Sequence, residues 1–180
     1  AQCILALLLS TGIRANELCT LRIQDVHLDP KEAYIKVFGK GSKWREVPLL
    51  ALYLDDQTGT AHIDHQAREL LSTYKQTYRA KAPATTSFFV DRTLRAPMGT
   101  DTLEKLLTRL GYRAGITEMS CNPHRFRHTF ATKFQTSVGD IYLLSKMMGH
   151  TSVAITERYL KSISGTGARL ALLRRLKVER

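Results

Sequence analysis

The sequence predicts a mainly α-helical domain that carries one small three-stranded antiparallel β-sheet. Apolar residues recur at helical spacing through most of the 180 residues. Only the stretch 24–50 changes to the alternation of apolar and polar residues that is typical of half-buried strands. A chain of this length, with 43% hydrophobic residues, can bury one substantial core, so we expect a folded globular domain.

The first two helices are expected at the start of the chain. Residues 1–11 are apolar around most of the helix circumference, which is typical of a short buried helix, and Gly12 is expected to end it. A second helix is predicted over 14–22. It places Arg14 where two helices meet, with Glu17 one turn further along as a supporting carboxylate.

The three strands are expected at 25–29, 33–38 and 44–49. The turn between the last two contains the sequence Gly-Lys-Gly-Ser-Lys, at 39–43. Because glycine adopts the backbone conformations of tight turns, this segment predicts a narrow hairpin tip. We expect Lys40 to project from that tip and to reach away from the sheet.

The remainder of the chain alternates helical patterns with polar or glycine-containing breaks. The terminal stretch 168–178 is amphipathic and follows the hinge Gly-Thr-Gly at 165–167, so we expect it to dock on a neighbour or on its own domain. Between the hairpin and this hinge, the expected order is a loop at 52–65, a helix at 66–80, a short extended piece at 88–90 and helices at 100–111, 123–136, 140–148 and 153–159.

The helix at 123–136 has an N-terminus suited to a phosphate. Asn122 is a natural N-cap and Pro123 a natural first-turn residue. His124 and Arg127 then lie one turn apart on the same face. Since a helix N-terminus has unpaired N–H donors and a partial positive charge, this stretch predicts phosphate chemistry.

The charge balance points to a polyanionic partner. Lys and Arg number 27 against 16 acidic residues, which gives a net charge of +11 and a pI near 9.8. Nucleic acid is the leading candidate. The longest apolar run, 4–9, is far too short to span a membrane. The three cysteines form no C-x-x-C pair, so we expect reduced thiols. Together these features predict a cytoplasmic, nucleoid-associated protein.

Polar residues at special positions form four motifs. They are Thr-Gly-Ile-Arg14-Ala-Asn-Glu17-Leu, Gly-Lys40-Gly-Ser-Lys-Trp-Arg-Glu-Val-Pro-Leu, Pro-His124-Arg-Phe-Arg127-His-Thr-Phe-Ala-Thr, and Met-Gly-His150 with Tyr159 nine residues later. In type, order and spacing this set resembles the catalytic domain of the tyrosine recombinase (phage integrase) family, over positions 1 to about 165. The family's usual Leu-Gly-His appears here as Met148-Gly149-His150.

The resemblance implies a site-specific DNA recombinase, or integrase, with that family's catalytic-domain fold. Tyr159 would be the nucleophile that forms a 3′-phosphotyrosyl link to DNA. Forked guanidinium groups suit the extra negative charge of a five-coordinate phosphorus, and by resemblance Arg14 and Arg127 supply them.

Proton transfer is assigned by the same resemblance. Lys40 would be the general acid for the departing 5′-oxygen, and His124 and His150 would assist by proton transfer or hydrogen bonds to the phosphate. Glu17 would orient Arg14. No metal or other cofactor is expected, because the guanidinium and ammonium groups take the place of divalent ions.

The expected partner is double-stranded DNA, held by a tetramer of protomers on two DNA sites. The family usually carries an additional N-terminal domain that clamps DNA, and we expect it to be absent here. Residues 1–164 would form the catalytic domain, and 165–180 a helix that packs on a neighbouring protomer. Candidate contacts to the DNA backbone are Lys36, Lys43, Arg45, Arg92, Arg95 and Arg125.

Several alternatives stay open on the sequence. A type IB topoisomerase would share the chemistry, and a catalytically silent DNA-binding module would share the charge. Lys43 rivals Lys40 for the acid role, and Arg14 with Glu17 could be an ordinary surface ion pair. A zinc site made of His124, His128 and His150 is disfavoured because no glutamate follows the first histidine as in H-E-x-x-H.

Overall fold

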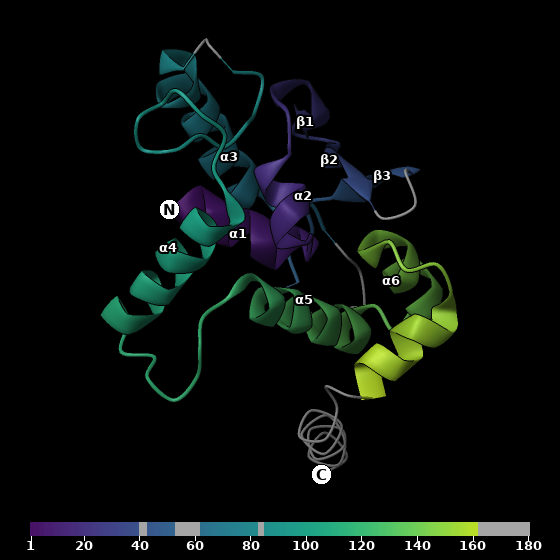
Figure 1. Cartoon of the computed structure of the whole chain (residues 1–180). Helices are drawn as coiled ribbons and strands as arrows, with labels where there is room; N and C mark the ends of the chain where they lie inside the picture. Colours follow the sequence, from purple (N-terminus) through teal and green to yellow (C-terminus); the bar gives the residue numbers. More distant parts are fainter. Residues whose placement is uncertain (40–42, 53–61, 83–84, 162–180) are drawn as a thin grey trace.

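The computed structural model describes residues 1–39, 43–52, 62–82 and 85–161. As predicted, it is mainly helical with one three-stranded antiparallel sheet (Figure 1). The helices are α1 (Gln2–Thr11), α2 (Ala15–Cys19), α3 (His65–Thr77), α4 (Thr100–Arg113), α5 (Pro123–Ser137) and α6 (Ile141–Met148), with short 3₁₀ turns η1 (Ile23–Asp25) and η2 (Arg79–Lys81) and a further helical stretch at 153–161. The strands are β1 (Val26–Leu28), β2 (Ala33–Gly39) and β3 (Lys43–Pro48).

Helix α1 lies at the centre of the domain and packs against α3 and α5 (Figure 1). Leu7 and Leu8 are fully buried, which confirms the prediction of a buried helix at the start of the chain. Gly12 ends α1 in the left-handed conformation, with φ of 61°, and its N–H donates to the carbonyl of Leu8 at 3.0 Å. The chain therefore turns sharply at the point where the first two helices meet.

The sheet uses the alternation seen in the sequence. Strand β2 pairs with both neighbours, so the order is β1-β2-β3. Ile35 and Val37 of β2 face the core, whereas Phe38 is about half exposed and lies opposite Trp44 of β3. The rings of Phe38 and Trp44 are 5.3 Å apart between centroids. The sheet thus has one face on the core and one aromatic face toward solvent.

The predicted cap of α5 is confirmed, and α6 has a cap of the same kind. The side chain of Asn122 accepts a hydrogen bond from the N–H of Arg125 at 3.0 Å, and Pro123 is the first residue of α5. The side chain of Asp140 begins α6 in the same way, and Gly149 ends it with φ of 62°. Within the described ranges no helix combines the length and apolar character needed to cross a membrane.

The second helix is shorter than predicted. α2 ends at Cys19, because the backbone that follows leaves the helix to pair with a distant segment. The N–H of Phe88 donates to the carbonyl of Leu21 at 2.7 Å, and the N–H of Ile23 donates to that of Thr86 at 3.0 Å. The predicted helix at 168–178 lies outside the described residues, so its packing stays a prediction.

Gly12 provides a stability test, because the ring of Phe130 packs directly on it. An added Cβ at Gly12 would lie 2.6 Å from Cγ of Phe130. We expect Gly12→Ala to lower the free energy of unfolding by about 2–4 kcal/mol, through overpacking and the positive φ together. Urea denaturation measures this. The matched control is Gly115→Ala, which has φ of 72° but nothing within 4 Å, and we expect it to cost only about 1 kcal/mol. Equal losses in the two variants would contradict the packing argument.

Candidate active site

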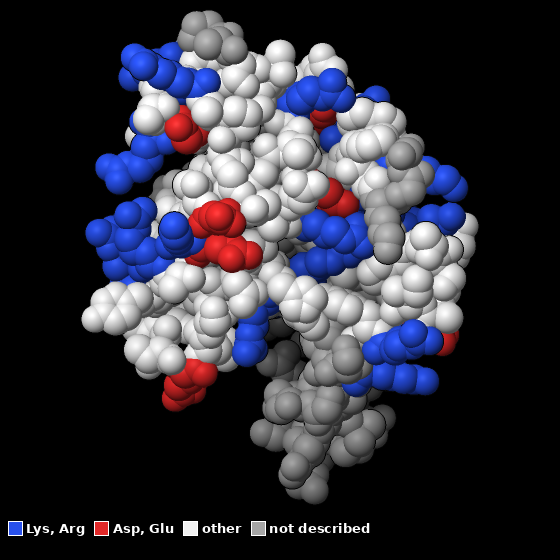
Figure 2. Space-filling model, viewed as in Figure 1, with Lys and Arg blue, Asp and Glu red and all other residues white. Residues whose placement is uncertain are grey.

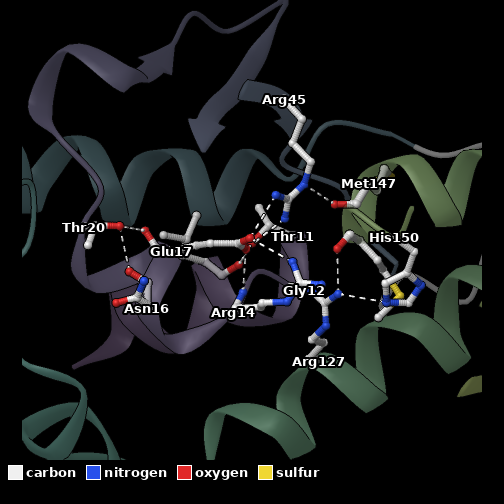
Figure 3. Close-up of polar contacts among 12 residues, drawn as sticks. Thr11, Gly12, Arg14, Asn16, Glu17, Thr20, Arg45, Arg127, Met147 and His150 are labelled. Atoms are coloured by element: carbon white, nitrogen blue, oxygen red, sulfur yellow. Dashed lines mark hydrogen bonds and ion pairs between the residues drawn. The ribbon is translucent and has the colours of Figure 1, made fainter. Parts of the chain in front are cut away.

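Three segments that are far apart in the sequence meet at one place. The N-terminus of α2 supplies Arg14, the first turns of α5 supply Arg127, and the loop after α6 supplies His150 (Figure 3). Beside them a cleft of about 850 Å³ opens between α2, α4 and α5. The cleft is lined by Arg14, Ala15, Glu104, Thr108, Ser120, Asn122, Pro123, His124, Arg125, Arg127 and His128.

Arg127 is buried, with only 5% of its surface exposed. Its Nη1 donates to the carbonyl of Gly12 at 2.7 Å, and its Nη2 donates to the carbonyl of Met148 at 2.7 Å. The guanidinium therefore joins the C-terminus of α1 to that of α6. Burial, together with the charge of Arg14, lowers the pKa of Arg127 to about 10, so the group is still charged at neutral pH.

Glu17 is a buried carboxylate with two arginine partners. It accepts hydrogen bonds from the backbone N–H and from Nη1 of Arg14, at 2.9 and 3.0 Å, and a bidentate pair from Arg45, at 2.9 and 2.8 Å. Burial raises the pKa of Glu17, but its bonds to Arg45 and then to Arg14 outweigh that effect, so the pKa lies below its ordinary value. The sequence left open that Arg14 and Glu17 form an ordinary surface ion pair. Glu17 is only 4% exposed, so its carboxylate is buried and the pair is not of that kind.

Arg45 has a structural role that the sequence reasoning missed. Besides its two bonds to Glu17, its Nε donates to the carbonyl of Met147 at 2.9 Å, and its side chain is 13% exposed (Figure 3). An added Cβ at Gly149 would lie 2.9 Å from its guanidinium carbon. Arg45 thus ties β3 to α2 and to the end of α6. The alternation of residues along β3 could have indicated this role, because it puts Arg45 on the same face of the strand as the buried Val47.

His150 lies between Arg127 and the helix at 153–161. Its Nδ1 is 2.8 Å from Oγ1 of Thr156, and its Nε2 is 3.4 Å from Nη2 of Arg127. Burial lowers the pKa of His150 to about 4, and the charges of Arg127, Arg14 and Arg45 act in the same direction. His150 is therefore neutral at pH 7. Thr156, which the sequence reasoning did not single out, is fully buried.

Tyr159 lies among three imidazole rings. Its ring stacks on His128, with centroids 4.8 Å apart, and lies 5.8 Å from the ring of His150 and 6.3 Å from that of His124. Nε2 of His128 is 2.6 Å from Nε2 of His124, and burial followed by the charge of His124 lowers the pKa of His128. Burial raises the pKa of Tyr159 to about 12 against the opposing charges of Arg127 and Arg14, so its hydroxyl keeps its proton at neutral pH.

Six of the seven predicted catalytic residues thus lie around one site, and the seventh, Lys40, lies outside the described residues. Figure 2 shows Lys and Arg side chains in and around a hollow near the middle of the face viewed in Figure 1. In the described ranges, no three His, Cys, Asp or Glu side chains gather as a metal site would require.

The predicted DNA contacts are more scattered. Arg125 is exposed at the cleft, Lys36 pairs with Glu46 at 3.2 Å on the outer face of the sheet, and Lys43 is exposed at the start of β3. Arg92 and Arg95 are exposed in the loop before α4. Contact with DNA stays a prediction for all of these residues. It also stays a prediction for Arg45, in addition to its structural role.

Comparison with known proteins identifies related chains. The model of the phage integrase family matches residues 1–164. A tyrosine recombinase of Agathobacter rectalis is 32% identical over 156 residues, which are 87% of this chain and 45% of that protein. Tyrosine recombinase XerD of Staphylococcus saprophyticus is 32% identical over 158 residues, or 86% of this chain and 48% of that protein. The chain therefore spans about half the length of the curated relatives it matches.

Solved structures share the fold. The crystal structure of XerA recombinase aligns with a TM-score of 0.76 and 29% identity, over 96% of this chain and 57% of that chain. XerH site-specific recombinase, in a pre-cleavage complex with its difH substrate, aligns with a TM-score of 0.70 and 24% identity, over 88% of this chain and 42% of that chain. Since the family model matches residues 1–164 of the 180, the chain belongs to the phage integrase family.

Proposed function

We propose that this chain is the catalytic part of a site-specific DNA recombinase that works through a 3′-phosphotyrosyl intermediate. The observation that carries the proposal is the convergence of Arg14, Arg127, His150 and Tyr159 at one site, although they come from positions throughout the chain. Membership of the phage integrase family supports the same reaction.

The proposed reaction exchanges one phosphoester bond for another. Oη of Tyr159 attacks a DNA phosphorus, the new Oη–P bond forms as the P–O5′ bond breaks, and Lys40 protonates the departing 5′-oxygen. Arg14 and Arg127 stabilise the extra charge on the non-bridging oxygens, and removing such a contact typically costs about 10²–10³ in rate. Because the phosphotyrosyl link keeps the bond energy, a second 5′-hydroxyl can reverse the step without a high-energy cofactor.

Removal of the tyrosine proton belongs to this step, because a pKa of about 12 leaves almost no tyrosinate at neutral pH. His124 and His150 are the proposed proton acceptors. Both rings lie close to that of Tyr159, and His150 is neutral at pH 7. Two guanidinium groups near the phenol oppose the effect of its burial and favour loss of the proton.

The proposed partner is double-stranded DNA. The net charge of +11 fits such a partner, and XerH, which shares the fold, is bound to its difH substrate. A tetramer on two DNA sites, with 165–180 packed on a neighbour, is part of the proposal, as is a location at the nucleoid. Guanidinium and ammonium groups supply the positive charge, so the proposed mechanism needs no metal.

The nucleophile assignment is tested by trapping. With a nicked suicide DNA that carries the target site, we expect the wild-type protein to form an adduct that resists denaturant, and Tyr159→Phe to form none, because phenylalanine has no oxygen to attack phosphorus. Gel electrophoresis measures the adduct. The matched control is Tyr142→Phe, on the exposed side of α6, which should keep wild-type adduct formation. An adduct that persists in Tyr159→Phe rules the assignment out. Relaxation of supercoiled DNA without joining of two duplexes would indicate a topoisomerase.

A second test asks whether Arg45 holds elements of the fold together. It compares substitutions of Arg45 and of Lys36, which lie on neighbouring strands but differ in burial. We expect Arg45→Gln to lower the free energy of unfolding by about 2–4 kcal/mol, since it leaves the buried Glu17 with one arginine. Lys36→Gln removes an exposed ion pair with Glu46 and a contact with the ring of Tyr34, and it should stay within about 1 kcal/mol of wild type. Urea denaturation measures both. If Arg45→Gln keeps full stability and only reduces the salt dependence of DNA binding, Arg45 is a phosphate contact rather than a tie between elements.

A further inference from the structure

We propose that Thr156 is a positioning residue that holds His150 in the tautomer with its proton on Nδ1, so that Nε2 presents a lone pair toward Arg127. The tautomer assignment rests on contacts within the chain. Its consequence for catalysis rests on the proposed function.

The Nε2 side of the ring faces a group that can only donate. Nη2 of Arg127 lies 3.4 Å from Nε2, and a guanidinium has no acceptor atom. Arg127 cannot easily turn away, because Nη1 and Nη2 are also bonded to the carbonyls of Gly12 and Met148. An N–H on Nε2 would point at another N–H. Nε2 therefore carries the lone pair, and a neutral imidazole then has its proton on Nδ1.

The Nδ1 side has a partner that can accept this proton. Oγ1 of Thr156 lies 2.8 Å from Nδ1, shorter than the contact on the other side of the ring, and Thr156 is fully buried. A threonine hydroxyl has two lone pairs, so Nδ1–H donates to it. The charged groups that act on His150 are Arg127, Arg14 and Arg45, each of which disfavours a second proton, as does burial. The ring of Tyr159, with its centroid 5.8 Å from that of His150, is a further titratable group beside it.

The same helix carries the nucleophile. Thr156 and Tyr159 are three residues apart in the helical stretch 153–161, which is close to one turn. Docking of this helix therefore brings the phenol ring beside His150 and sets the tautomer of His150 at the same time. In that state Nε2 can accept a hydrogen bond or a proton from a hydroxyl. It cannot donate to a phosphate oxygen until the ring gains a second proton.

The tautomer can be measured without DNA. In the full chain with ¹⁵N-labelled histidine, long-range ¹H–¹⁵N NMR at pH 7 should show a protonated Nδ1 and an unprotonated Nε2 for His150, assigned with His150→Gln. Thr156→Val keeps the side-chain shape and removes the acceptor, so we expect the tautomer ratio to shift by about fivefold to tenfold. Thr156→Ser restores the hydroxyl and should restore the ratio. The matched control is Thr136→Val on α5. The exposed hydroxyl of Thr136 bonds to backbone carbonyls of its own helix, so this variant should leave the His150 signals unchanged.

Each outcome decides the proposal. A wild-type His150 with its proton on Nε2 overturns the assignment, and an unchanged ratio in Thr156→Val overturns the role of Thr156. If the valine variant does not fold by circular dichroism, Thr156→Ala takes its place as the variant without a hydroxyl, and the wild-type spectrum still tests the tautomer. With suicide DNA we expect Thr156→Val to form the adduct about tenfold more slowly at unchanged DNA affinity, and Thr156→Ser to recover the rate. An adduct that survives Tyr159→Phe contradicts the proposed function and leaves the NMR result standing.

Discussion

The buried carboxylate of Glu17 is the charge on which the arrangement of the site depends. Three guanidinium groups, those of Arg14, Arg45 and Arg127, influence one another across a small volume, and Glu17 is the acidic group that offsets them. Like charges held this close repel, so the folded domain stores an excess of positive potential at the cleft. An arriving phosphate would relieve that excess, which makes the site complementary to an anion before any anion binds.

The fold could be predicted from the sequence wherever the signal is local. The cap at Asn122 and the helix end at Gly12 depend on residues within one turn, and the structure has them as predicted. The early end of α2 could not be predicted, because it depends on two long-range hydrogen bonds, one between Leu21 and Phe88 and one between Ile23 and Thr86. Helix propensity gives no indication of such a long-range pairing.

The same distinction holds for the site. The order and spacing of the motifs identified Arg14, Arg127, His150 and Tyr159 as candidates for one site. A resemblance to a family indicates which distant residues meet in the fold, whereas helix and strand propensities do not. The contacts that hold these groups required the structure. Arg45 and Met147 are 102 residues apart, and Arg127 and Gly12 are 115 apart, so neither bond has a local signature. Thr156 was missed because a threonine one turn before a tyrosine has no distinctive pattern.

The exposed aromatic pair of the sheet has an experimental consequence. Trp44 is the chain's single tryptophan, it is 51% exposed, and it lies on the hairpin that leads to Lys40. The guanidinium of Arg22 lies 5.3 Å from its ring. Indole emission depends on the polarity and charge around the ring, so the unmodified protein contains its own optical probe. Its fluorescence reports on whatever covers this hairpin, and the signal comes from one known position.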